Sequence, residues 1–162
     1  MAGLYIDHGW NMGWFALRRG NAITAGSVDF RAHCHTDGMR LLAMTQWLTA
    51  TLGQLDAAGE KLTEIVYERV TFVGKNDADT VHAHGKQLGT LERWAALKKQ
   101  PDPRGIAVDV IKKHVTGHRS AKRDYVRDEM RRRFPAYPNM DADQASAMAV
   151  MLTANPHFRT PA

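Results

Sequence analysis

Three strand-like patterns within the first thirty residues limit the possible folds of this sequence more than any other feature. Residues 3–7, 13–19 and 22–30 are apolar or alternating runs, and Gly20-Asn21 stands between the second and the third. A Gly-Asn pair between two such runs is a hairpin-turn signal, so the flanking strands should pair antiparallel. The chain is therefore expected to open with an antiparallel meander.

After this meander, helical and strand-like patterns alternate along the chain. Apolar residues at helical spacing predict a first helix, capped by Thr36 or Asp37 and stopped by Gly59. The later elements are predicted as a strand at 64–68, a helix from Asp77 or Asp79 to about residue 99, a strand at 106–111, a helix at 120–133 capped by Ser120, and a helix at 141–152. This order predicts the α/β class, with a mixed central sheet flanked by helices.

The composition is that of an ordinary globular protein. With 162 residues, 44% of them hydrophobic and 24% charged, the chain is expected to form one domain at 1–155 and a short tail at 156–162. Its single cysteine, Cys34, excludes an intrachain disulfide framework. The sequence has neither a long apolar run nor a signal-peptide pattern, so a cytoplasmic protein without a membrane partner is expected.

Carboxylates stand at the ends of several predicted elements. Asp7 ends the first strand, Glu68 ends the fourth, and Asp141 and Asp143 open the last helix. Such positions are where α/β proteins build their sites, and acids in apolar strands need a partner when they are buried. Oxygen ligands suit Mg²⁺ or Mn²⁺, and two such ions can activate a water and stabilise the leaving oxygen in phosphodiester cleavage. The alternative is that each acid caps a helix or is solvated at a loop.

The positive charge is concentrated in one segment. Residues 98–133 hold twelve Lys and Arg against five Asp and Glu, a net +7 that exceeds the +5 of the whole chain. A local excess of this kind is typical of surfaces that contact phosphates. The alternative, for the helix at 120–133, is a solvated face whose arginines pair with acids one turn away.

Together these motifs resemble the RuvC-type Holliday junction resolvases, which have a ribonuclease H-like fold. The resemblance covers most of the chain. Residues 5–9 resemble the first strand of the family with its metal-binding Asp, and residues 66–70 resemble its second acidic motif. Residues 110–123 resemble the basic, DNA-contacting segment, and residues 135–149 resemble the last catalytic helix.

The resemblance implies a ribonuclease H-like nuclease domain and a metal-dependent, structure-selective endonuclease. Such an enzyme, a crossover junction endodeoxyribonuclease, resolves four-way DNA junctions by paired symmetric cleavage in recombination and repair. It also implies a homodimer, two Mg²⁺ ions per active site that Mn²⁺ can replace, and a bacterial or phage-infected host. Two alternatives stay open, namely a broader nuclease for flaps and forks, and a junction-binding protein that does not cleave.

The resemblance also implies roles for individual residues. Catalytic and metal-binding roles fall on Asp7, Glu68, Asp141 and Asp143, and DNA-binding roles fall on Lys112, Lys113, Arg119, Lys122, Arg123 and Phe72. Phe72 is expected either to stack on a base at the crossover or to be buried.

The last helix fits the family pattern in two registers. The family usually has two acidic or polar ligands three residues apart, which are either Asp141 and Gln144 or Asp143 and Ser146 in this sequence. A shift of one residue rotates a helical side chain by about 100°, so the two registers place different groups in the site.

Two histidines flank these motifs. His8 follows the first acid, and His114 lies in the basic segment. Either imidazole can carry a proton near neutral pH, or it can be an ordinary hydrogen-bonded or surface histidine.

Overall fold

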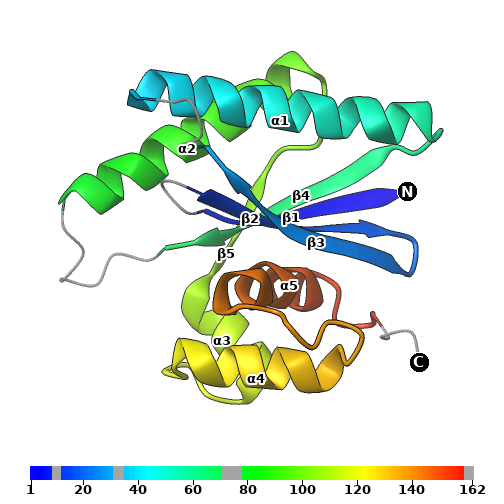
Figure 1. The fold of residues 1–162 in the computed structure, drawn as a ribbon, viewed down its shortest axis with the longest axis vertical. Coiled ribbons are helices and arrows are strands. Elements are labelled where there is room, and N and C mark those ends of the chain that lie inside the picture. The colour runs from blue at the N-terminus through cyan, green and yellow to red at the C-terminus, as the bar shows by residue number, and fades with distance from the viewer. Residues whose placement is uncertain (9–11, 31–34, 71–77, 159–162) are drawn as a thin grey trace.

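A mixed five-stranded sheet forms the centre of the protein in a computed structural model, which describes residues 1–8, 12–30, 35–70 and 78–158 (Figure 1). Its strand order is β3-β2-β1-β4-β5. The strands are β1 (Ala2–Asp7), β2 (Met12–Arg19), β3 (Ala22–Asp29), β4 (Leu62–Arg69) and β5 (Arg104–Ala107). The helices are α1 (Asp37–Ala57), α2 (Ala78–Leu97), α3 (Val108–Thr116), α4 (Arg123–Arg133) and α5 (Ala142–Ala154).

The pairing of the strands confirms the predicted mixed sheet. β2 runs antiparallel to both β1 and β3, whereas β4 runs parallel to both β1 and β5. Gly20 adopts a positive φ of 59° in the turn between β2 and β3, a conformation that glycine reaches without steric cost. The expected hairpin and meander are therefore present.

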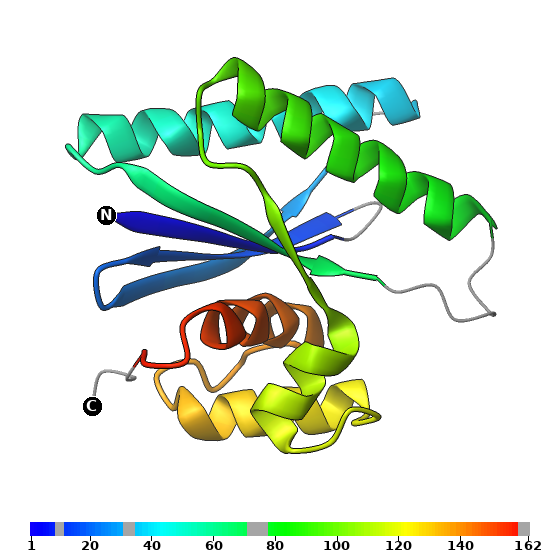
Figure 2. The same ribbon diagram turned by 180° about the vertical axis from the view of Figure 1, so that it is seen from behind.

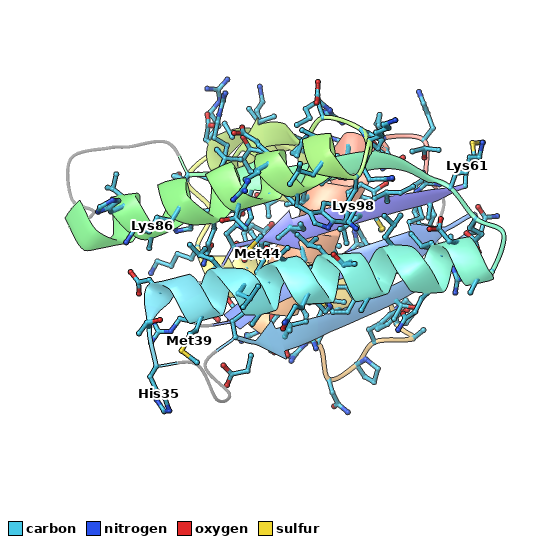
Figure 3. The ribbon with its side chains drawn as sticks, turned by 90° about the horizontal axis from the view of Figure 1, so that it is seen from above. His35, Met39, Met44, Lys61, Lys86 and Lys98 are labelled. Carbon is cyan, nitrogen blue, oxygen red and sulfur yellow. The ribbon has the colours of Figure 1, made fainter. Side chains whose placement is uncertain are left out.

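Helices cover both faces of this sheet. Figures 1 and 2 show α1 and α2 on one face and α3, α4 and α5 on the other. Figure 3 looks down on α1 and α2, which lie side by side across the sheet with Met44 between them. None of the helices in the described ranges has the combined length and hydropathy of a membrane-spanning segment.

Alternate residues of the central strands enter different cores, as the two-residue period of a strand requires. Leu4 and Ile6 pack with the core under α1 and α2, whereas Tyr5 and Val66 pack with the core around α5. Asp7 follows Tyr5 at an interval of two, and Glu68 follows Val66 in the same way. Both carboxylates therefore lie on the α5 face of the sheet.

Helix α5 is buried on all sides. Ala145 and every residue from Ala147 to Leu152 are buried, as expected for a helix that is apolar around its whole circumference. Its far end is tied to β1, because the Asn155 side chain donates a 2.8 Å hydrogen bond to the Tyr5 hydroxyl. The same hydroxyl donates to Glu64 at 2.5 Å, and burial raises the pKa of Tyr5 to about 12. These contacts fix the C-terminal end of α5 against β1.

The predicted strand at 106–111 is wrong. The strand there is β5, which ends at Ala107, and α3 begins at the next residue. The alternation of apolar residues imitates a strand, but Ile111 and Val115 lie four apart and bury one face of a helix. Gly117, with a φ of 81°, then ends α3 in the left-handed conformation.

The predicted helix caps have mixed outcomes. Thr36 is confirmed as the cap of α1, because its hydroxyl oxygen accepts a 3.2 Å hydrogen bond from the Met39 amide. Ser120 is wrong as the cap of α4, since that helix begins at Arg123 and Lys122 occupies the cap position without a side-chain hydrogen bond. Asp77 lies outside the described residues.

Candidate active site

Asp7 and Glu68 face one cavity at the carboxyl ends of two parallel strands. The cavity has a volume of about 240 Å³, and Lys112, Arg123 and Ser146 also line it. β1 and β4 supply the carboxylates, α3 and α4 supply the two cations, and α5 supplies the hydroxyl. The fold therefore brings together side chains from five elements that are far apart in the sequence.

Burial raises the pKa values of both carboxylates. Burial raises the pKa of Asp7 to about 7, and the charge of Glu68 adds to this effect. Arg123 and a hydrogen bond with Ser146 act in the opposite direction on the pKa of Asp7. Burial also raises the pKa of Glu68, against the charges of Arg123 and Lys112. For both acids, burial therefore outweighs the stabilising effect of the nearby cations on the ionised form.

Asp143 is connected to the carboxylate Asp7 through a shared ion-pair partner, Arg123. The Arg123 Nη2 atom lies 3.8 Å from Asp7 Oδ2 and forms an ion pair with Asp143 Oδ1. The side chains of Asp7 and Asp143 are only 13% and 23% exposed. Within the described residues, no group of three or more His, Cys, Asp and Glu side chains is spaced to hold a metal ion. A guanidinium, not a cation-binding cluster, connects these carboxylates.

Asp141 caps a helix in the structure. It is the N-cap of α5, where its Oδ1 atom accepts hydrogen bonds from the amides of Asp143 at 2.9 Å and Gln144 at 2.7 Å. The Gln144 side chain accepts in return from the Asp141 amide at 3.3 Å, which completes a capping box. In the other register, the Ser146 side chain contacts Asp7, and Asp143 shares the ion-pair partner Arg123 with Asp7.

The predicted DNA-binding residues surround the cavity at different depths. Lys112 lines it, whereas Lys113 and Lys122 are exposed and are the sequence neighbours of the cavity-lining Lys112 and Arg123. Arg119 is exposed as well and pairs with Asp109 at 3.2 Å. Arg123 lies within the cavity among the carboxylates, and Phe72 lies outside the described residues.

The other arginines of α4 are engaged within the protein. Arg127 pairs with Asp124 and Asp128, both at 3.0 Å, while Arg131 donates to the Met140 carbonyl. Arg132 and Arg133 both bind Glu129 and hold the pKa of that carboxyl down to about 2. For these four arginines, the alternative interpretation is therefore correct: most of them pair with acids of their own helix.

The histidine beside the first acid is buried and neutral. The His8 ring lies 5.6 Å from the ring of Tyr67 and 6.4 Å from that of His84. Burial lowers the pKa of His8 to about 3 and also lowers the pKa of His84, so neither imidazole gains a proton near pH 7. His114 is exposed on α3. The pairing of His8 with His84 depends on how α2 is rotated against the sheet, for which the sequence gives no local signal.

The fold is similar to that of solved protein structures. RuvC from Thermus thermophilus superposes with a TM-score of 0.70 at 16% sequence identity, covering 100% of both chains. The chain has the RuvC fold. T. thermophilus RuvC in complex with a Holliday junction substrate gives a TM-score of 0.72, also at 16% identity, over 100% of this chain and 99% of that one. No protein-family model matches the sequence, and no curated protein matches it. The predicted ribonuclease H-like fold is thus confirmed, by structure and not by sequence similarity.

The donors of the cavity in this RuvC fold fit a hard divalent cation. Asp7 and Glu68 present carboxylate oxygens to one space, and Ser146 adds a hydroxyl. The raised pKa values of the two acids indicate buried negative charge that a cation would stabilise. Oxygen donors of this kind prefer Mg²⁺ or Mn²⁺.

We expect the ionisation of Asp7 to destabilise the metal-free protein as the pH rises from about 4 to about 7, whereas His8, whose pKa burial lowers to about 3, acts on stability in the opposite direction over the same range. The Asp7 carboxyl binds its proton more tightly in the folded state, so the stabilisation is complete below the unfolded-state pKa of about 4. It is lost as the pH passes the folded-state pKa of about 7. Thermal unfolding in EDTA across this range measures the effect, and saturating Mg²⁺ should reduce it because a cation favours the ionised acids. Because His8 changes the Tm in the opposite direction, the effect of Asp7 is the difference in Tm between the unmodified protein and Asp7→Asn. A difference that stays constant over this range would contradict the assigned charges.

Proposed function

We propose that this protein is a metal-dependent, structure-selective endonuclease that resolves four-way DNA junctions by paired symmetric cleavage. The observation that carries the proposal is the joining of Asp7 and Glu68 with Lys112 and Arg123 in one cavity at the strand ends of a RuvC fold. The T. thermophilus RuvC of the same fold has been solved with a Holliday junction substrate, which supports branched DNA as the partner. The enzyme would act in the cytoplasm of a bacterial or phage-infected cell.

The carboxylates and the cations of the site would have different roles, namely metal binding and neutralisation of phosphate charge. Asp7, Glu68 and Asp143 would hold two divalent ions, which when bound supply an activated water and stabilise the 3′-oxygen leaving group. Lys112 lies in the same cavity, where its ammonium would neutralise charge that develops on the reacting phosphate. The Ser146 side chain, hydrogen-bonded to Asp7, orients that carboxylate toward the cavity.

The exposed basic residues beside the cavity would position the DNA. Lys113, Arg119 and Lys122 lie on and after α3 and are exposed at the surface. Cations at such places contact backbone phosphates and set the register of the duplex without reading its sequence. Binding should therefore weaken steeply as the salt concentration rises.

Paired cleavage calls for a homodimer. A four-way junction with two-fold symmetry presents two equivalent strands, so two active sites related by a two-fold axis would cut them together. Each chain supplies one carboxylate cavity. Exposed apolar side chains on the α1 and α2 layer, including Met39 (Figure 3), Leu42 and Leu97, offer surface for such a contact.

One observation favours a non-cleaving junction-binding protein as the second candidate. The register that points into the site has Ser146 where a fourth carboxylate would complete the ligand set, and Arg123 already neutralises part of the negative charge. If these carboxylates do not hold the metal ions, the exposed cations Lys113, Arg119 and Lys122 would still bind the phosphate backbone, and the junction would not be cut.

Cleavage of a synthetic four-way junction tests the proposal directly. The full chain is incubated with end-labelled junctions in Mg²⁺, in Mn²⁺ and in EDTA, and its mass in solution is measured. We expect paired nicks at symmetric positions in opposite strands with either metal, none in EDTA, and a mass twice that of the chain. Equal cutting of flaps and forks would support the broader nuclease, and binding without any cutting would support the second candidate.

A further inference from the structure

Arg123 places a positive charge where three carboxylates converge. Its guanidinium pairs with Asp143 and lies 3.8 Å from Asp7, and its charge acts on Glu68 as well. These are the same three acids that would hold divalent cations under the proposed function. The guanidinium therefore stands in the region that a metal ion would have to enter.

The guanidinium of Arg123 makes the ion pairs of this side chain. Arg123 is the first residue of α4, its side chain is 58% exposed, and among the described residues its ion pairs are those with Asp7 and Asp143. Arg127, on the same helix, is bound by two acids of that helix and is 29% exposed. A guanidinium anchored in this way can leave the cavity toward solvent by rotation of its side chain, without movement of α4.

A divalent cation and this guanidinium cannot share the carboxylates without repulsion. Both are attracted by the same negative charges, and like charges at such separations oppose each other most strongly where water is excluded. Arginine also has a planar fork of donors that matches the oxygens of a phosphate. A guanidinium displaced from the cavity would meet the DNA backbone at the cavity's mouth.

We propose that Arg123 is a displaceable counter-ion of the carboxylate cavity, which stabilises the metal-free protein and is transferred to a DNA phosphate when a divalent cation enters. The metal-displacement step follows from the ion pairs alone, whereas the transfer to DNA rests on the proposed function. Because binding free energies are linked reciprocally, the cation should strengthen DNA binding and DNA should strengthen cation binding.

Calorimetric titration of Mn²⁺ into the full chain without DNA tests the displacement. Arg123→Gln removes the charge, and we expect it to bind Mn²⁺ about five- to tenfold more tightly than the unmodified protein, within the usual range of such couplings. Arg127→Gln removes a charge from the same helix outside the cavity and should leave the affinity unchanged, as should Arg123→Lys, which keeps the competing charge. Equal or weaker Mn²⁺ binding by Arg123→Gln would overturn the proposal, as would a lack of Mn²⁺ binding by all four proteins.

Junction binding in Ca²⁺ tests the transfer to DNA and separates the two hypotheses. The plot of log affinity against log salt should be shallower for Arg123→Gln by about one phosphate contact, with no change for Arg127→Gln. If the unmodified protein cuts junctions but Arg123→Gln binds Mn²⁺ no more tightly, the counter-ion role of Arg123 is refuted and the proposed nuclease function is supported. If Arg123→Gln binds Mn²⁺ more tightly but no junction is bound, the displacement of Arg123 by metal is supported, whereas its transfer to DNA and the proposed function are refuted.

Discussion

Asp7→Asn is expected to lower junction cleavage by about a thousandfold or more while making the metal-free protein more stable. The carboxylate is a proposed metal ligand, and the loss of one member of a group that acts together removes most of the catalysis. The same carboxylate is buried beside Glu68, and its ionisation above a pKa of about 7 costs folding free energy. An amide of equal size keeps the shape and removes the charge, so we expect a gain of about 1–3 kcal/mol at pH 8 in EDTA.

Two measurements check this pair of effects in one variant. Thermal unfolding in EDTA should give a higher Tm for Asp7→Asn at pH 8 and nearly the same Tm at pH 4, where the carboxyl is protonated. Asp56→Asn, an exposed acid on α1, serves as the matched change and should leave both cleavage and Tm unaltered. Binding of junctions in Ca²⁺ should persist in both variants. An Asp7→Asn protein that still cleaves, or that is less stable than the original at pH 8, would refute the role assigned to this acid.

The sequence predicts well those features that depend on local periodicity. Two apolar strands that each end in an acid predict that Asp7 and Glu68 lie at strand ends. That both carboxylates lie on the α5 face follows from the β1–β4 register, in which Ile6 pairs with Tyr67, and the sequence alone does not fix this register. The α3 helix was missed because alternating valines imitate a strand over four residues, and the interval between Ile111 and Val115 is visible only over a longer window. Short apolar runs leave this ambiguity between strand and helix open.

Features that depend on tertiary contacts are not visible in the sequence. A count of Lys and Arg locates the basic segment, but it cannot separate Arg131, which is bound to a backbone carbonyl, from Lys113, which is free on the surface. The position of Arg123 among the carboxylates depends on the packing of α4 against α5, which no local pattern encodes. The role of Asp141, by contrast, has a local signal, since an acid followed by glutamine three residues later is the pattern of a capping box.

Because Asp141 caps α5 and Asp143 faces Arg123, we expect substitutions of these two neighbouring acids to differ in their effect on cleavage. Asp143→Asn should reduce cleavage by about a hundredfold or more, because its carboxylate pairs with Arg123 at the cavity and is a proposed ligand. Asp141→Asn should retain cleavage, because its oxygen serves as the cap of α5 and asparagine caps helices about as well as aspartate.

A third substitution separates capping from catalysis at the same position. Asp141→Ala removes the cap and should cost about 1 kcal/mol of stability, measured by urea unfolding, with cleavage kept at a temperature where the protein stays folded. If Asp141→Asn abolished cleavage and Asp143→Asn did not, Asp141 and Gln144 would be the ligand positions, and α5 would have to rotate toward them on binding metal. The capping geometry argues against this rotation, because it would leave the amides of Asp143 and Gln144 without their acceptor.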